Sequence, residues 1–481
     1  MSEGLKHPKE SSFRASLKNA TSQVPEAEHV EFTPEQERKL WRKIDLRLMP
    51  IISLMYLFAF MDRGNAKLEG LVTQLDLTGN RFNVALTTFF ISYILFECPA
   101  NVAIHRVRPS RWLPFLMVSG LLASALAYST QTYYPQLAAV RFCLGLAEGG
   151  FYPGLAYYLT MWYPKYKLQY RLALFLGMTT AAGAFSGLLA YGIGFMNNVG
   201  GLQGWSWIFI IEGLITVVIC CIAAIIFVDY PGTAKFLSAE ERLFVEQERR
   251  EYQFRDVEDD EEGTILQRVW MTLADWQVWA MSIVLMSVVT PGKCFHSSLA
   301  DRFGYSTAIS QLLTVPIYVA AAIVMLTAAH FSDKRKLRSP FILVLQSIAL
   351  IGYVIELSDA SAGVKYFGTF LCVVGVFAPL PCAVCWLANN LEGKYKRAIG
   401  LAFQNSIAGI GGIIASNIYR AKDDPRFILG HVVSIGFLVV GFLTALSTAL
   451  IYRRINLNRH ALVQGGKGGG DIRQGHPLRT L

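Results

Sequence analysis

Charged side chains are scarce in this sequence. Only 16% of its 481 residues are Asp, Glu, Lys or Arg, whereas 53% are hydrophobic, and the mean hydropathy is +0.37. A soluble globular domain carries about 25% charged residues, so this composition argues against one. Cysteine pairs in loops are also lacking, because all eight cysteines fall inside or at the ends of apolar segments. Neither a disulfide framework nor a metal site is therefore expected, and no cofactor is predicted.

Long apolar runs stand in place of a soluble core. A helix needs about 20 apolar residues to cross the hydrocarbon core of a bilayer, and runs of this length recur along the chain. Their continuity excludes barrel strands, which alternate between apolar and polar residues. The sequence thus predicts an all-α polytopic membrane protein with twelve transmembrane helices. The predicted spans are residues 48–68, 83–104, 112–131, 136–158, 172–195, 205–228, 273–295, 307–331, 340–357, 365–388, 398–419 and 429–452.

Lys and Arg are distributed unevenly among the loops. Basic clusters occur in alternate loops, whereas residues 112–140 and 172–234 contain no Lys or Arg. By the positive-inside rule, the basic loops and both termini are predicted to be cytoplasmic. The net charge of +9 is then explained by this asymmetry, without a nucleic-acid partner. The default location is the plasma membrane.

The polar segments divide the chain into predicted parts. Residues 1–47 form a cytoplasmic tail with a short amphipathic helix, which begins at a capping box, Thr33 to Gln36. Residues 230–272 form a cytoplasmic linker with a second capping box, Ser238 to Glu241. A flexible cytoplasmic tail follows at 454–481. The two six-helix bundles occupy 48–229 and 273–453.

These two halves repeat each other at an offset of 226 residues. The matching residues are Phe151 and Phe377, Pro153 and Pro379, Arg171 and Arg397, Ala182 and Ala408, and Gly183 and Gly409. A parallel repeat of six-helix halves is the arrangement of the major facilitator fold. Such halves enclose a site near the bilayer midplane and expose it to each side in turn.

Several ionisable residues lie within the predicted spans. Such charges are costly in a bilayer unless they are paired or face a water-filled cavity. Arginine suits a carboxylate ligand because its planar group forms two parallel hydrogen bonds. The predicted substrate-binding residues are Arg63, Arg141, Lys293, Gln404 and Asn405. A carboxylate in a low-dielectric site holds a proton more readily. The predicted proton-coupling residues are Glu148, Asp62 and Glu97.

Structural roles remain open for some of these residues. Glu97 either titrates or bonds the backbone freed by Pro99, and Arg141 either binds the anion or extends to the membrane surface. Asp62 either contacts substrate or neutralises Arg63. Lys293 lies where span seven ends and belongs either to the site or to a solvated rim.

Six motifs carry a resemblance to a known family. They are LRLMP (46–50), DRGN (62–65), YILFECPAN (93–101), PSRW (109–112), RFCLGLAEGGFYPG (141–154) and LTVP (313–316). By these motifs the chain resembles the anion:cation symporter family, and within it the fungal allantoate and nicotinate permeases. The resemblance covers nearly all of the chain outside the tails.

The resemblance implies a function for the chain. The expected activity is the uptake of a small organic anion, nicotinate-like, ureide or another monocarboxylate, with a proton by alternating access. The transporter is expected to act as a monomer. Similarity to the family's vesicular anion transporters implies substrate and proton roles at the positions of Arg63, Arg141 and Glu148.

A gating signature is expected after spans two and eight, with an acid and several basic residues. Asp333 and Arg335 keep it after span eight, where Asp333 is predicted to pair across the halves and close the inward gate. The loop after span two has Arg106 and Arg111 but no acid.

Other functions compete with proton-coupled transport. A nutrient sensor with this fold, or an uncoupled uniporter, remains an alternative. A membrane acyltransferase is suggested only by the spacing of His296 and Asp301, which lacks accompanying phosphate-binding residues.

Overall fold

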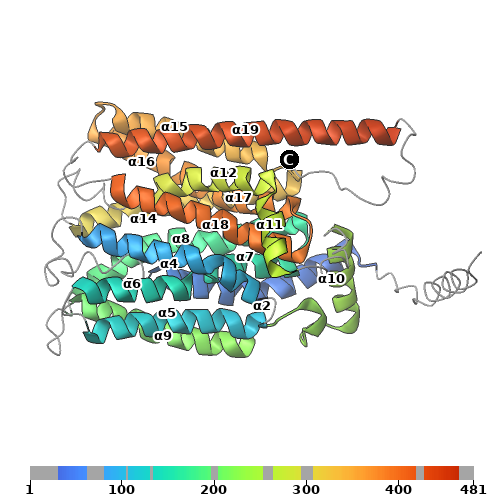
Figure 1. The fold of residues 1–481 in the computed structure, drawn as a ribbon, viewed down its shortest axis with the longest axis horizontal. Helices are drawn as coiled ribbons and strands as arrows, with labels where there is room; N and C mark the ends of the chain where they lie inside the picture. The colour runs from blue at the N-terminus through green and yellow to red at the C-terminus, as the bar shows by residue number, and fades with distance from the viewer. Residues whose placement is uncertain are drawn as a thin grey trace, which may run out of the picture.

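The computed structural model describes residues 31–61, 81–104, 107–130, 134–194, 196, 204–252, 264–293, 307–418 and 427–464. Within these ranges the chain is helical and contains no strand. Most of the helices run side by side in one elongated bundle (Figure 1). Judged by length and composition alone, six described helices suffice to cross a membrane, and a seventh does if α11 and α12 count as one bent span.

Every predicted span corresponds to a helix or a helix pair. The first six are α2 (Pro34–Met61), α4 (Arg81–Ala103), α5 (Pro109–Thr130), α6 with α7 (Tyr134–Glu148 and Phe151–Trp162), α8 (Lys165–Gly194) and α9 (Gly204–Ile226). The last six are α12 (Trp276–Lys293), α14 (Thr307–Arg335), α15 (Ser339–Leu357), α16 with α17 (Ala362–Phe377 and Leu380–Asn390), α18 (Lys394–Ile418) and α19 (Ile428–Gln464). Between the halves lie η3 (Pro231–Thr233), α10 (Ala239–Tyr252) and α11 (Ile265–Leu273). The twelve-helix prediction is confirmed.

Both predicted capping boxes are present. The Thr33 amide donates to Gln36 Oε1 at 2.9 Å and starts α2, while the Ser238 amide donates to Glu241 Oε2 at 2.8 Å and starts α10. The first box does not open a separate short helix, because α2 continues without a break to Met61.

Spans four and ten each consist of two helix segments. Span four is interrupted at Gly149 and Gly150, and span ten at Ala378 and Pro379. A Cβ at Gly149 would lie 2.6 Å from the carbonyl oxygen of Tyr93, so α4 packs directly on the first break. Pro379 has no amide proton to continue the helical bonding of α16. The two breaks lie close together in the repeat but three residues apart, because Gly149 and Gly150 correspond to Gly375 and Val376 at the offset of 226.

The last helix extends further than expected. α19 runs to Gln464, eleven residues into the region predicted as a flexible tail from 454. Residues 454–464 contain neither Gly nor Pro, and a run rich in glycine follows directly at 465. The helix therefore projects beyond its neighbours in the bundle (Figure 1).

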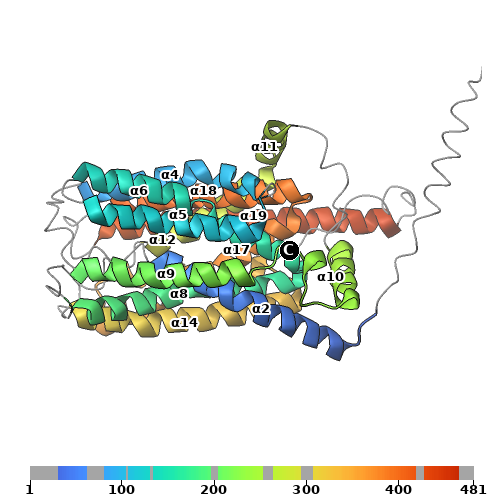
Figure 2. The ribbon, with the colours of Figure 1, turned by 90° about the horizontal axis from the view of Figure 1, so that it is seen from below.

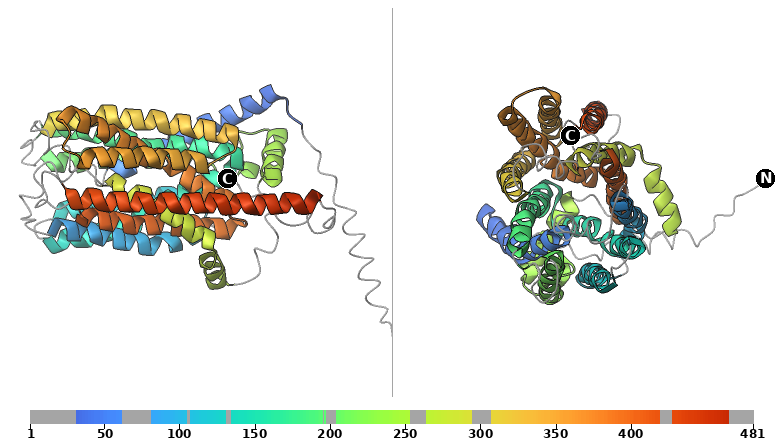
Figure 3. Two further views of the ribbon diagram at one scale, coloured as in Figure 1. Left: turned by 90° about the horizontal axis from the view of Figure 1, so that it is seen from above. Right: turned by 90° about the vertical axis from the view of Figure 1, so that its left-hand side faces the viewer.

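The two halves meet along two pairs of helices. α8 lies beside α14 and α4 beside α18, as the view along the bundle shows (Figure 3). The repeated glycines lie in these contacts: a Cβ at Gly183 would be 3.0 Å from the Tyr318 ring, and one at Gly409 would be 3.0 Å from Ile94. Small residues at these positions allow the backbones of the two halves to approach closely.

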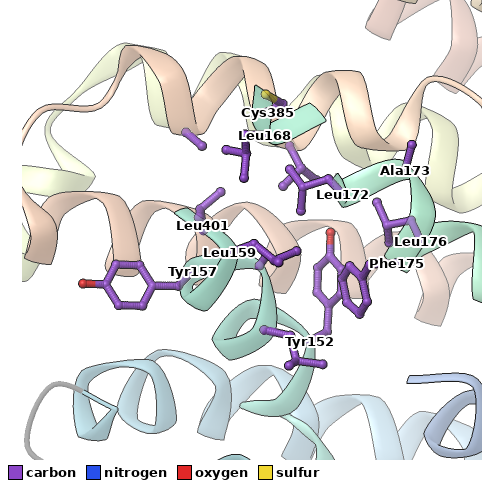
Figure 4. Packing of buried hydrophobic residues seen from close by; sticks show 14 of the residues in the cluster. Tyr152, Tyr157, Leu159, Leu168, Leu172, Ala173, Phe175, Leu176, Cys385 and Leu401 are labelled. Atoms are coloured by element: carbon purple, nitrogen blue, oxygen red, sulfur yellow. The ribbon is translucent and has the colours of Figure 1, made fainter. Parts of the chain in front are cut away.

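One end of the bundle carries α10, α11, the start of α2 and the end of α19 (Figures 1 and 2). We call it the α10 end. Near it, apolar side chains of both halves pack together, with Leu168 and Leu172 of α8 close to Cys385 of α17 (Figure 4). Tyr157 of α7 lies near Leu401 of α18 in the same layer (Figure 4). The halves are therefore closed against each other here.

Candidate functional site

A buried carboxylate joins the two halves between α4 and α18. Glu97 is 0% exposed and accepts hydrogen bonds from Asn405 Nδ2 at 2.5 Å and from Ser406 Oγ at 2.8 Å. Asn405 Nδ2 also lies 3.3 Å from the hydroxyl of Tyr93, one helical turn before Glu97. Both donors belong to the second half and Glu97 belongs to the first. We call these four residues the Glu97 cluster.

A second polar contact crosses the same pair of helices one turn nearer the α10 end. Asn101 Nδ2 donates to the carbonyl oxygen of Ala398 at 2.8 Å, and Asn101 is fully buried. Sequence reasoning missed this residue as a functional candidate. The signal was its place in the YILFECPAN motif, four residues after Glu97, which puts both side chains on one face of α4.

Gln404 and Asn405 are neighbours in sequence but lie in different surroundings. Gln404 Nε2 donates to the carbonyl oxygens of Met281 and Ala383 at 3.1 and 3.3 Å, within the second half. Asn405 lies at the contact between the halves. The pair was predicted to bind substrate together, but the structure places only Asn405 where the halves meet.

Arg141 and Glu148 both lie on α6 and are largely covered by protein, with 8% and 5% of their surfaces exposed. Their spacing of seven residues puts them about two turns apart on one face. A Cβ at Gly120 of α5 would lie 3.5 Å from Glu148 Cγ, so the carboxylate side chain passes close to α5. This burial does not fit an arginine that extends to the membrane surface, which was the alternative reading of Arg141.

Some predicted site residues cannot be placed. Asp62, Arg63 and Arg106 lie outside the described residues, as do His296 and Asp301. Lys293 is the last residue of α12, and its side chain is not described.

Asp333, the predicted gate residue, contacts the other half. Its Oδ2 accepts from the backbone amide of Tyr170 on α8 at 2.9 Å, and its Oδ1 accepts from Arg338 at 2.6 Å. Arg338 is fully buried and also donates to the carbonyl oxygen of Lys165 at 3.2 Å. The partner is therefore Arg338 and not Arg335, which is exposed, as is Arg111.

Ser332 and Gln169 extend this contact towards α17. Ser332 Oγ donates to Gln169 Oε1 at 2.8 Å, and Gln169 Nε2 donates to Cys382 Sγ at 2.5 Å. We call Asp333, Arg338, Ser332 and Gln169 the Asp333 clasp. Nothing in the basic run 334–338 singled out Arg338, because which of its cations turns inward depends on the turn between α14 and α15.

Ion pairs fasten corresponding helices within each half near the α10 end. Arg171 donates to both carboxylate oxygens of Asp45 at 3.0 and 2.7 Å and joins α8 to α2. Lys396 lies 2.7 Å from Asp275 and joins α18 to the start of α12. The repeat had paired Arg171 with Arg397, yet Arg397 donates to the carbonyl oxygen of Leu391.

Twelve helices in two repeated halves are the arrangement of the major facilitator fold. A family model described as Major Facilitator Superfamily matches residues 52–416. The chain belongs to this superfamily. It is therefore a multi-pass membrane protein.

Two fungal relatives are similar over most of their length. An uncharacterized transporter of Schizosaccharomyces pombe is 33% identical over 89% of this chain and 86% of its own. The high-affinity nicotinic acid transporter of Saccharomyces cerevisiae is 30% identical over 89% of this chain and 80% of its own. Among solved structures, the proton:xylose symporter XylE matches with a TM-score of 0.63 and 14% identity, over 84% of this chain and 95% of that one. The similarity to XylE, at 14% identity, concerns the fold alone.

Proposed function

We propose that this protein is a secondary active transporter that takes up a small organic anion together with a proton. The observation that carries the proposal is Glu97, a fully buried carboxylate of one half that accepts two hydrogen bonds from the other half. A titratable group placed between two moving bodies links its proton to their relative position. The similarity to a nicotinic acid transporter favours a nicotinate-like or other small monocarboxylate as cargo.

Opening the α10 end requires breaking the contacts between the halves. These contacts are the Glu97 cluster, the Asn101 bond and the Asp333 clasp. An ionised Glu97 offers only acceptors, which match the amide of Asn405 and the hydroxyl of Ser406. A protonated Glu97 has one acceptor site fewer. Its added O–H donor does not match the donors that Asn405 and Ser406 direct at it. Proton binding therefore weakens the closed arrangement and favours opening.

The anion needs a cationic group near the centre of the bundle. Arg141 is buried on α6, seven residues from Glu148, and keeps its charge at all working pH values. We assign substrate binding to Arg141 with Arg63, Lys293 and Asn405, and a second protonation site to Glu148. Asp62 supports Arg63 in this scheme.

Orientation and location complete the proposal. The α10 end carries the basic loops, so it faces the cytosol by the positive-inside rule. The proposed membrane is the plasma membrane, with the Asp333 clasp as the inward gate.

The test is uptake by cells that lack their own carrier. Labelled nicotinate and a panel of ureides and other monocarboxylates are offered at external pH values from 5 to 8, with and without an uncoupler. Uptake is expected to rise as external pH falls and to stop when the proton gradient is removed. Uptake of a substrate that ignores both pH and the uncoupler would refute proton coupling and indicate a uniporter.

Glu97→Gln tests the assigned residue. We expect uptake to depend less on external pH than in the unmodified protein, because glutamine keeps the shape but cannot titrate, whereas Glu148 still can. The matched control is Glu356→Gln, since Glu356 is also buried and accepts from Thr369 Oγ1 at 2.9 Å, but within the second half. An unchanged pH profile in Glu97→Gln would remove Glu97 from the coupling step.

Arg141→Ala tests the anion site. Flux is expected to vanish at unchanged surface expression, whereas Arg141→Lys should keep part of it, because the charge remains but the planar fork is lost. Normal transport by Arg141→Ala would contradict this assignment.

Substrate binding without flux in the unmodified protein would indicate a nutrient sensor instead of a transporter.

A further inference from the structure

The short helix α11 has a direction unlike that of the spans. It is bent by 68° from α12, to which it is joined at Ala274 and Asp275. Figure 2 shows α11 standing off the side of the bundle at the α10 end. A helix at this angle to a transmembrane helix runs nearly parallel to the membrane surface.

One side of α11 is apolar and uncovered by protein. Leu266 and Trp270 are each 67% exposed and Met271 is 60% exposed. Leu266 and Trp270 are four residues apart and share one face of the helix. Such exposure of large apolar side chains on a nine-residue helix is costly in water.

The other side of α11 is held against the bundle. Thr272 is buried, and the guanidinium of Arg268 lies 4.3 Å from the centre of the Tyr395 ring on α18. The Thr264 amide donates to Gln267 Oε1 at 2.9 Å and caps the helix start. The helix is therefore fixed in its rotation, and its exposed apolar side is not free to turn inward.

The exposed side continues into a surface that faces the bilayer. Trp276 and Trp279 at the start of α12 are both exposed, and Trp279 Nε1 donates to the carbonyl oxygen of Leu273, at the end of α11. Tryptophan is enriched where hydrocarbon meets headgroups, because its ring is apolar and its N–H group is polar. Three exposed tryptophans, Trp270, Trp276 and Trp279, thus lie on the two sides of the bend.

We propose that α11 is an in-plane membrane anchor that binds the lipid interface of the cytoplasmic leaflet through Leu266, Trp270 and Met271. The ligand is the bilayer surface, with acyl chains against the apolar side and headgroups beside the exposed Gln267. The anchor also holds the start of α18, through Arg268 on Tyr395 and through the ion pair of Lys396 with Asp275. α18 carries Asn405 and Ser406 of the Glu97 cluster, so the anchor sets the position of that helix relative to the membrane.

Quenching by brominated lipids tests the anchor in the full chain. The protein is reconstituted into phosphatidylcholine vesicles brominated at acyl carbons 6 and 7 or at 11 and 12, and Trp270→Phe is compared with the unmodified protein. The fluorescence of the unmodified protein minus that of the variant is the emission of Trp270. We expect that emission to be quenched at least about twofold more by the shallow bromines than by the deep ones, as for a ring at the headgroup boundary.

The matched control is Trp162→Phe, because Trp162 is fully buried in α7. The fluorescence lost in Trp162→Phe, which is the emission of Trp162, should not be quenched by bromine at either depth. Acrylamide in the water phase provides the second measurement, and it should leave the Trp270 emission largely unquenched. Emission from Trp270 that acrylamide quenches and bromine does not would overturn the proposal. It would place α11 in water or against a protein partner.

Discussion

At the scale of single residues, glycines determine how closely α4 and α6 approach. A Cβ at Gly145 would lie 2.1 Å from Ser92 Oγ and 2.3 Å from the carbonyl oxygen of Phe89. The carbonyl belongs to backbone inside a helix and has no room to move. The spacing of these two helices, which carry Glu97 and Arg141, therefore depends on a missing side chain.

We expect Gly145→Ala to destabilise the protein by about 1–3 kcal/mol, the usual effect of inserting atoms into a packed contact. Gly177→Ala is the matched control, since a Cβ at Gly177 meets nothing within 4 Å and alanine favours the helix. The measurement is the melting temperature of the detergent-solubilised protein. Equal melting temperatures for both variants would contradict the packing described here.

Among the elements, α10 is held to α2 by one ion pair and to Phe32, two residues before α2, by one ring contact. Glu241 lies 2.7 Å from Lys43, and Phe244 stacks on Phe32 with ring centres 4.4 Å apart. Partial burial by itself would raise the pKa of Glu241. The hydrogen bonds from Lys43 and Ser238 outweigh it, so this pKa lies below its ordinary value.

A lowered folded-state pKa gives a defined pH dependence. The contribution of Glu241 is present above the unfolded pKa of about 4.3 and is lost as pH falls through the lower, folded value. We expect Glu241→Gln to speed hydrogen exchange in α10 at pH 7 and to match the unmodified protein at pH values below the folded pKa. The control is Glu240→Gln in the same turn, which is exposed. Identical exchange in both variants at pH 7 would contradict the role of the ion pair.

The Asp333 clasp joins α14 and α15 to α8, and Cys382 is a native reporter of its closure. Cys382 is fully buried beside Gln169. We expect Asp333→Ala to raise the labelling rate of Cys382 by a membrane-permeant maleimide, because the α10 end opens more often. Arg335→Ala is the control, since Arg335 lies on the same turn of α14 but is exposed. Unchanged labelling in Asp333→Ala would show that the clasp does not hold the end closed.

At the scale of the whole molecule, non-covalent contacts join the halves. They run along α4 with α18 and α8 with α14 and include the Glu97 cluster and the Asp333 clasp. We expect a protein cut at a protease site inserted within 253–263 to stay associated in mild detergent and to keep its uptake activity. Co-purification of the two fragments is the measurement, and the uncut protein is the control. Separation of the fragments would show that the linker itself maintains the assembly.

The twelve spans were predictable because hydrophobic length is a property of each segment alone. The capping boxes at Thr33 and Ser238 were predictable for the same reason, since each is satisfied within four residues. The division of spans four and ten into two helix segments each was not predicted, because apolar content continues through Gly149 and Ala378.

The number of spans, the repeat of the halves and the polar residues within the spans follow from local sequence. Which of these polar residues contact each other depends on how the helices pack. Glu97 and Asn405 are 308 residues apart, and their contact depends on the rotation and axial position of two helices from different halves. Asp333 pairs with Arg338, because a single turn sets which cation of the basic run points inward. Hydrophobic length is local, whereas such pairings exist only after the halves have packed.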